Sequence, residues 1–298
     1  MLTKIKNNIK SILKHSPLVE QFLWDKYYHK RFETELALIK GVHENNNNHP
    51  SIIHFSFNKA ATQYVKSILW RCAAKNGMVP VGIHDYAFNT NFPFLDHLSV
   101  EEMGKYKHIF KSTGYLYSVF GGMIEGISCL EEYKIVLVTR DPRDILISTY
   151  YSTVYSHGVP VKTGDKHDKF MSARKKAREL TIDNYVISES ARVYDIFSRY
   201  QTLLIDKYKN TYVTTYEQMV SDFESWLTEL IKYCELEVSR EFIQSLLKEH
   251  EDKKPKKENI HKHIRKGQPG DYKQKLQPST IKYLNEKFEP ILTSYHYN

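Results

Sequence analysis

Three separated segments of the chain carry residues of the kind that bind phosphate or sulfate. The first runs from Asn58 to Tyr64 and contains Lys59, the second runs from Arg140 to Ser148, and the third is Arg265-Lys266-Gly267. The first segment follows an apolar, strand-like run and precedes a helix-like one, so we expect its backbone N–H groups at a helix N-terminus, where anions bind. The sequence therefore predicts one anionic nucleotide site built from distant parts of the chain.

The residue types in the first two segments suit this chemistry. A phosphate-binding loop needs small residues, which let N–H groups approach the anion, and a lysine that neutralises charge; Lys59 and the two alanines after it supply both. The GxxxxGK[ST] pattern of nucleotide triphosphatases is absent. Arg140 leaves a strand-like run and Ser148 follows two helical turns later, so both can face one anion. The alternative is that Arg140 only pairs with Asp144 and Ser148 is a surface hydroxyl.

The elements expected around these segments alternate between strands and helices. This alternation favours an α/β fold with a central parallel sheet flanked by helices, in which ligands bind beyond the carboxyl ends of the strands. We expect a helical N-terminal extension over residues 1–48 and one domain over residues 49–298. The expected strands are 51–57, 78–84, 133–139 and 211–215, and the expected helices are 62–76, 142–155, 184–208, 223–234 and 240–250. Residues 156–178 and 251–277 are expected to be irregular.

Composition and charge set limits on the class of protein. The 298 residues are 41% hydrophobic and carry a net charge of +8, which is enough apolar material for a core and favours anionic partners. Charge alone does not choose among nucleic acid, a membrane surface, an acidic polymer and a charged cofactor. The three cysteines have no metal-ligand spacing and are expected to be reduced. Without a signal peptide or a transmembrane run, the sequence predicts a cytoplasmic protein.

Taken together, the segments resemble the cofactor site of the sulfotransferase family, which uses 3′-phosphoadenosine-5′-phosphosulfate (PAPS) as sulfuryl donor. The first family motif, PKSGTTW, appears here as NKAATQY over residues 58–64, and the family's arginine and the serine eight residues later match Arg140 and Ser148. The closing motif RKGxxGDW appears as RKGQPGDY over residues 265–272. Residues 214–219, TTYEQM, resemble a strand end whose tyrosine reaches the adenine. The four motifs are similar in order as well, over residues 51–292.

The resemblance implies a P-loop-NTPase-like sulfotransferase fold, a reaction that needs no metal, and a role for each motif. Lys59 would neutralise charge on the leaving phosphate, and Ser148 would restrain Lys59 until an acceptor arrives. The 5′-phosphosulfate would be held by backbone amides of Ala60, Ala61, Thr62 and Gln63. The 3′-phosphate would be bound by Arg140, Ser148, Arg265, Lys266 and Gly267, and the adenine by Tyr64 and Tyr216.

The general base stays open in this sequence. Cytosolic members carry Lys-Thr-His where this chain reads Lys111-Ser112-Thr113, which puts a threonine at the place of the histidine and a lysine in reach of the transferring sulfuryl group. Other branches supply an acid after the strand that follows the first helix, and His84 and Asp85 occupy that location. Each is more often a structural residue. His108 is a further candidate, although its neighbours suggest a strand.

The sequence thus predicts a PAPS-dependent sulfotransferase that acts on a hydroxyl or an amine, with a small molecule favoured over a glycan as acceptor and no nucleic-acid partner. Residues 86–97 and 156–178 are expected to line the acceptor pocket. The alternatives are a nucleotide-dependent kinase of related fold and a non-catalytic protein that binds an anionic polymer. A kinase would need a metal-binding hydroxyl after the lysine, where this chain has Ala60. A displaced partial match at 280–286 to a dimer-forming segment leaves a homodimer open.

Overall fold

The computed structural model describes residues 27–156, 158–159, 164–253 and 267–297. Two compact units divide the chain, Met1–Glu44 and Asn45–Asn298. Within the first unit, helix α3 spans Glu33–Ile39, and just before it the rings of Tyr28 and Phe32 stack with their centroids 5.7 Å apart. Residues 1–26 of the predicted helical N-terminal extension lie outside the described residues.

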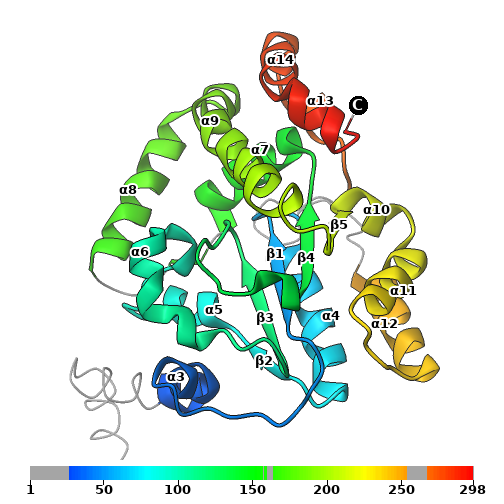
Figure 1. The fold of residues 1–298 in the computed structure, drawn as a ribbon. Helices are drawn as coiled ribbons and strands as arrows, with labels where there is room; N and C mark the ends of the chain where they lie inside the picture. The colour runs from blue at the N-terminus through cyan, green and yellow to red at the C-terminus, as the bar shows by residue number, and fades with distance from the viewer. Residues whose placement is uncertain (1–26, 157, 160–163, 254–266, 298) are drawn as a thin grey trace, which may run out of the picture. The chain divides into compact units, whose positions relative to one another are not determined.

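The second unit is built on a five-stranded sheet in the order β2-β3-β1-β4-β5 (Figure 1). Every neighbouring pair of these strands is parallel, and Ile53 in the middle of β1 lies between Tyr117 of β3 and Ile135 of β4. The strands are β1 (Ile52–Ser56), β2 (Val79–Val81), β3 (Tyr115–Phe120), β4 (Lys134–Thr139) and β5 (Thr211–Thr215). The predicted α/β class with a central parallel sheet is confirmed.

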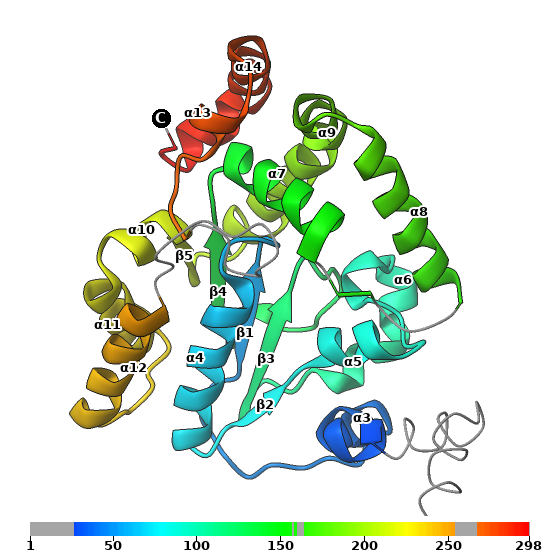
Figure 2. The ribbon, with the colours of Figure 1, turned by 180° about the vertical axis from the view of Figure 1, so that it is seen from behind.

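Helices cover both faces of this sheet (Figures 1 and 2). Alternate residues of β1 point to opposite faces. On one face Phe57 stacks on Phe197 of α9 (Ile182–Tyr200) with the ring centroids 3.9 Å apart. On the other face lies α4 (Thr62–Lys75), whose apolar side is buried. His54 is also fully buried, and its Nδ1 lies 2.9 Å from Ser118 Oγ.

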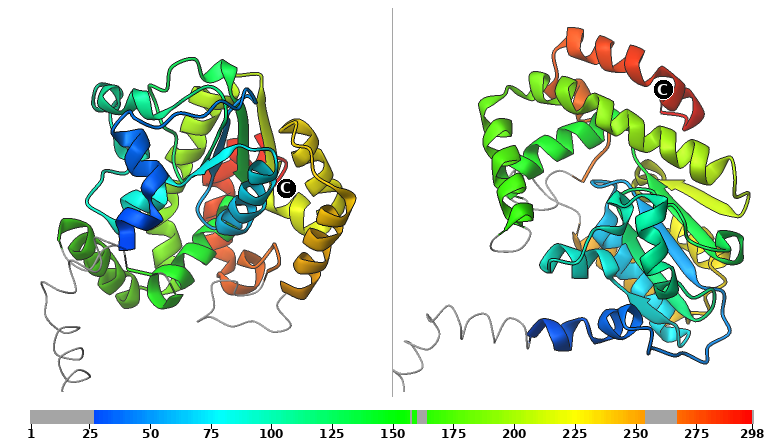
Figure 3. Two further views of the ribbon diagram at one scale, coloured as in Figure 1. Left: turned by 90° about the horizontal axis from the view of Figure 1, so that it is seen from below. Right: turned by 60° about the vertical axis from the view of Figure 1, so that its left-hand side comes forward.

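The helix after β4 is fixed locally by its first residues. Asp141 caps α7 (Pro142–Tyr151) by accepting a hydrogen bond from the Arg143 amide, and Pro142 occupies the first turn, where a missing N–H costs nothing. At the C-terminal end of the chain, α14 lies along α9 (Figure 3). The other α-helices are α5 (Ile83–Asn89), α6 (Val100–Met103), α8 (Asp165–Glu179), α10 (Tyr216–Ser221), α11 (Phe223–Tyr233), α12 (Arg240–Lys253), α13 (Tyr272–Lys275) and α14 (Pro278–Ser294).

The structure corrects three sequence predictions. Strand β3 was not predicted, although Tyr115–Phe120 is an apolar run of the right length. Helix α8 lies in the stretch expected to be irregular, because no glycine or proline interrupts Asp165–Glu179. His108 belongs to a 3₁₀ helix, Gly104–Ile109, and not to a strand. Among the described helices, none is both long and apolar enough to cross a membrane.

Candidate active site

The loop between β1 and α4 has the backbone of an anion-binding site. Lys59 and Ala61 both have left-handed backbones, with φ of 79° and 57°, which cost about 1–3 kcal/mol each and concentrate at functional sites. Thr62 Oγ1 donates to the Phe57 carbonyl at 2.9 Å and so closes the loop. Among the described residues no side chain caps α4, so the amides of Thr62 and Gln63 are left for another acceptor.

Lys59 is held by Ser152, which lies one helical turn after Ser148, the serine predicted from the sequence. Its Nζ donates to Ser152 Oγ at 2.5 Å, whereas Ser148 was expected to restrain it. Ser152 is buried and starts the single π-helical turn Ser152–Ser156 that continues α7, while Ser148 is half-buried. Burial and the nearby Arg140 lower the pKa of Lys59 to about 8. The lysine can therefore change its charge near neutral pH.

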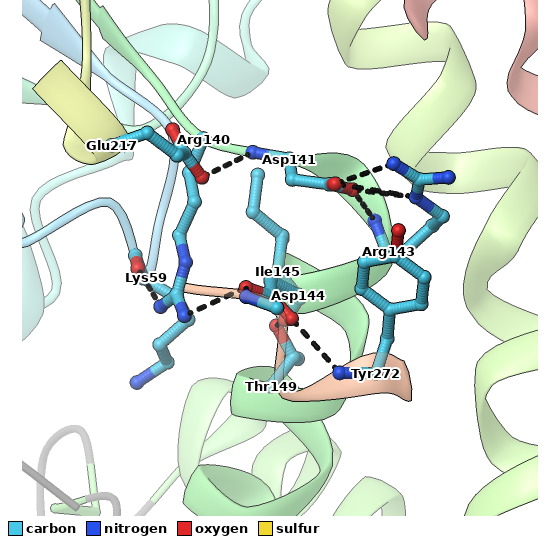
Figure 4. Close-up of polar contacts among 10 residues, drawn as sticks. Lys59, Arg140, Asp141, Arg143, Asp144, Ile145, Thr149, Glu217 and Tyr272 are labelled. Atoms are coloured by element: carbon cyan, nitrogen blue, oxygen red, sulfur yellow. Dashed lines mark hydrogen bonds and ion pairs between the residues drawn. The ribbon is translucent and has the colours of Figure 1, made fainter. Parts of the chain in front are cut away.

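Arg140 joins the second segment to the first. It follows β4, and its Nη1 donates to the Lys59 carbonyl at 3.0 Å while its Nη2 contacts Asp144 at 3.4 Å (Figure 4). Its guanidinium also lies 4.2 Å from the centroid of the Tyr216 ring, which begins α10 after β5. The Arg140–Asp144 pair that the sequence left as an alternative is thus present. It does not occupy the whole guanidinium, because the buried Nε has no hydrogen-bond partner among the described residues.

Asp144 joins the second segment to the described end of the closing motif, residues 267–272 (Figure 4). Its side chain is fully buried, and its two oxygens accept hydrogen bonds from the amides of Gly270 at 2.7 Å and Tyr272 at 3.0 Å. Gly270 has φ of 80°, which favours glycine there. The first two predicted segments and the described end of the closing motif, residues 267–272, are therefore brought together, and Asp144, which the sequence suggested only as a partner of Arg140, links the second segment to that motif. Arg265 and Lys266 lie outside the described residues.

Glu217 is a buried carboxyl that the sequence did not single out. Its Oε1 accepts a hydrogen bond from the Asp141 amide at 3.1 Å, and Oε2 has no partner within the described ranges. Burial raises its pKa to about 7. The only indication in the sequence that Glu217 lies near the site is its position directly after Tyr216 in the fourth motif. Nothing in the sequence shows that its carboxyl is buried.

Tyr64, expected against the adenine, belongs to an aromatic cluster. Its hydroxyl lies 3.1 Å from Nδ1 of His250, whose ring stacks on Phe223 with centroids 3.8 Å apart and a 7° interplanar angle. Flat rings of this kind offer stacking surfaces for a base. The two partners of Tyr64 come from α12 and α11, and the sequence singled out neither.

The two neighbouring base candidates have different surroundings. Both lie at the start of α5, directly after β2, at the carboxyl edge of the sheet. Asp85 forms an ion pair with Lys66, whose ammonium also lies 4.4 Å from the centroid of the Trp70 ring. His84 instead faces a second carboxylate, with its Nδ1 3.8 Å from Oδ1 of Asp96.

The predicted role of Lys111 is wrong. The segment Lys111-Ser112-Thr113 precedes β3, and the Ser112 carbonyl accepts a hydrogen bond from the Ser51 amide just before β1. Lys111 therefore lies at the amino edge of the sheet, one strand length, or roughly 17 Å, from the loop of Lys59. The threonine cannot replace a catalytic histidine either. The misplacement arose because β3 was not recognised, and its carboxyl end carries Phe120 and Gly121 instead.

Comparison with known proteins identifies the family of the chain. A family model described as the sulfotransferase domain matches residues 124–296, more than half of the chain. The chain therefore belongs to the sulfotransferase family, as the motifs predicted. A search of curated protein sequences found no match.

Solved structures that match the chain include two sulfotransferases. Mouse sulfotransferase SULT7A1 complexed with PAP is 14% identical, with 86% of this chain and 89% of that chain covered and a TM-score of 0.48. Sulfotransferase STF9 from Mycobacterium avium is 9% identical, with 90% and 81% covered and a TM-score of 0.47.

Proposed function

We propose that the protein transfers the sulfuryl group of PAPS to a hydroxyl or an amine of a small molecule in the cytoplasm, with the donor bound across the three joined segments. One observation carries this proposal. Arg140 contacts the Lys59 carbonyl and Asp144, and Asp144 holds the closing motif through the amide of Gly270. A single donor with phosphates at both ends would meet cationic or N–H groups from all three segments at once.

In this proposal the 5′ end of the donor lies at the loop before α4. The uncapped amides of Thr62 and Gln63, with that of Ala61, would hold the phosphosulfate, whereas the Ala60 amide, which was predicted to join them, donates to the Phe57 carbonyl at 3.0 Å. Lys59 would neutralise the negative charge that develops on the leaving phosphate oxygen as the S–O bond breaks.

The 3′-phosphate would lie against Arg140. The free Nε of this arginine and its position at a strand end suit a phosphate oxygen, and Ser148 follows on the same helix. Arg265, Lys266 and the Gly267 amide would complete this half of the site. Gly267 has φ of 69°, a backbone that favours glycine there. Tyr64 and Tyr216 are the proposed adenine contacts.

The proposed acceptor is a small molecule with an apolar or aromatic part. Aromatic rings surround the loop after α5: the ring centroid of Phe92 in this loop lies 5.4 Å from that of Tyr86 in α5 and 5.2 Å from that of Tyr106 in the 3₁₀ helix Gly104–Ile109. Lys166 of α8 fastens this loop by donating to the carbonyls of Ala87, Thr90 and Phe92 at 2.6–3.0 Å. The two segments proposed to line the pocket thus contact each other.

Calorimetric titration with 3′-phosphoadenosine-5′-phosphate (PAP), AMP, and ATP with magnesium tests the donor site. PAP should bind, and Arg140→Ala should weaken PAP by about 10- to 100-fold, since a hydrogen bond to a charged group contributes ~1.5–3 kcal/mol, while changing AMP little. Arg192→Ala, which removes an exposed ion pair with Glu189, is the matched control and should bind PAP normally. A preference for ATP with magnesium would favour the kinase alternative and refute the proposal.

A further inference from the structure

A buried histidine–carboxylate pair lies beyond the end of β2, apart from the residues that would hold the donor. His84 Nδ1 and Asp96 Oδ1 are 3.8 Å apart, and neither buried atom has a hydrogen-bond partner among the described residues. His84 comes from α5 and Asp96 from the 3₁₀ helix Leu95–His97. Burying two facing polar atoms that have no other hydrogen-bond partners costs free energy unless the two atoms interact with each other.

Asp96 is fixed in place by the end of β3. Its Oδ2 accepts a hydrogen bond from the Gly122 amide at 2.9 Å. A Cβ atom on Gly122 would lie 3.2 Å from that oxygen, and a Cβ atom on Gly121 would lie 2.9 Å from Nδ2 of Asn58, the residue before Lys59. The end of β3 therefore packs between Asp96 and the loop that carries Lys59, and this connects the pair to the donor site through direct contacts.

Two other potential proton acceptors, Asp85 and His54, are unsuitable. Asp85 is engaged by Lys66. His54 is fully buried, bonds to Ser118 Oγ, and has its pKa lowered by burial to about 3. His84 differs because its side chain is 26% exposed, so its ring reaches both the buried carboxylate and the outside, while Asp96 is 4% exposed.

The charges around His84 suit a neutral imidazole that can be protonated. The groups that act on it are Asp96 and Asp85, which raise its pKa, and His97 and Lys66, which lower it; burial is the largest influence, and the pKa is lowered. An imidazole that is neutral at neutral pH can accept a proton. The Asp96 carboxylate then stabilises the imidazolium that forms.

We propose that His84 is the general base of the sulfuryl transfer and that Asp96 is the positioning residue that holds its imidazole; this rests on the proposed function. When the 3.8 Å between His84 Nδ1 and Asp96 Oδ1 closes to hydrogen-bond distance, Asp96 accepts the Nδ1–H, which leaves the Nε2 lone pair for the acceptor. As the acceptor oxygen or nitrogen bonds to sulfur, its proton passes to Nε2. The bond from sulfur to the bridging oxygen of the 5′-phosphate breaks, and that oxygen keeps the electron pair. The products are the sulfated acceptor, PAP and an imidazolium.

The pairing can be tested without knowing the acceptor. In the PAP-bound protein, ¹⁵N NMR of the histidine rings, with His84 assigned by its loss in His84→Gln, should show a protonated Nδ1 and an unprotonated Nε2. Asp96→Asn should lower the pKa of His84, because the carboxylate stabilises the imidazolium. An unchanged pKa, or a proton on Nε2 in the wild-type protein, would overturn the pairing.

The proton transfer is tested with phenols as acceptors. His84→Gln should lower kcat/KM for 2-naphthol by about 100-fold or more, the usual scale of general base catalysis, and should affect the more acidic 4-nitrophenol less. In Asp96→Asn the acidic limb of the pH profile should move to lower pH. His29→Gln, which changes an exposed histidine of the first unit, is the control and should behave as wild type.

PAP affinity distinguishes a failure of the His84 assignment from a failure of the proposed function. His84→Gln should bind PAP as tightly as wild type, because His84 does not contact the donor. If PAP binds and His84→Gln sulfates 2-naphthol at the wild-type rate, the base assignment is overturned while the proposed function stands. If PAP does not bind to the wild-type protein, the proposed function itself fails.

Discussion

Replacing Lys59 by methionine should abolish the proton uptake that accompanies PAP binding near pH 8. Burial and Arg140 hold the pKa of the free lysine at about 8. A phosphate beside the ammonium favours its charged form, so binding returns the pKa to its ordinary value, roughly 10.4, or higher. The protein therefore takes up a proton whenever Lys59 is neutral before PAP binds.

The size of the effect follows from the pKa of the free lysine. At pH 8 half of the lysine is neutral, so about 0.5 proton should be taken up, compared with about 0.1 at pH 7 and about 0.9 at pH 9. Because the folded, PAP-bound state has the higher pKa, affinity should fall as pH rises through 8. Between pH 7 and pH 9 the dissociation constant should increase about tenfold.

Isothermal titration calorimetry in buffers of different ionisation enthalpy measures this proton uptake directly. The phosphates of PAP also titrate, with a second pKa of about 6, and Lys59→Met gives their contribution as the background. The difference between wild type and Lys59→Met at pH 8 should be about half a proton. Equal uptake in both proteins would refute the assignment of Lys59 to the phosphate site.

Three further predictions follow from the contacts in and near the site. Ser152→Ala removes an acceptor for the Lys59 ammonium, so the midpoint of the proton uptake should move below pH 8; an unchanged midpoint would contradict the contact. Asp144→Asn leaves a buried cation poorly compensated and should lower the free energy of unfolding in urea by about 3 kcal/mol, whereas the exposed control Glu286→Gln should change it by less than about 0.5 kcal/mol. Because the pKa of Glu217 is raised to about 7, the wild-type protein loses stability as pH rises from about 4.5 through about 7. The free energy of unfolding of Glu217→Gln, relative to wild type, should therefore increase by about 2 kcal/mol between pH 5 and pH 8 in urea titrations. A pH-independent difference would place this carboxyl in solvent.

The parts of the site that the sequence predicted are those set by local patterns. A strand, a lysine with small residues and a helix follow one another within residues 52–75, and Arg140 directly follows a buried strand. Such patterns depend on neighbouring residues only, so they can be recognised without the fold. The fold class followed in the same way from the alternation of strands and helices.

The parts of the site that the sequence could not predict depend on contacts between distant residues, or on a choice between two residues that the spacing leaves equivalent. Asp144 accepts from Gly270, which is 126 residues away. Ser148 and Ser152 lie four residues apart at the end of one helix, so spacing alone puts both on the same face and cannot say which one meets Lys59. Lys111 was misplaced because a motif was assigned before the strand that positions it, β3, was known.

The strand order has a consequence for how the enzyme can diversify. In the strand order β2-β3-β1-β4-β5, the segments proposed for the donor follow β1, β4 and β5, which are neighbours in one half of the sheet. His84, Asp96 and the loop after α5 follow β2, the strand at the opposite edge. The proposed donor half needs residues gathered from most of the chain, from Lys59 to Tyr272, whereas the proposed acceptor half comes mainly from two stretches, residues 82–97 and 156–178. A change in the length or sequence of either stretch can therefore give a new acceptor preference in a single step while the donor site is inherited intact.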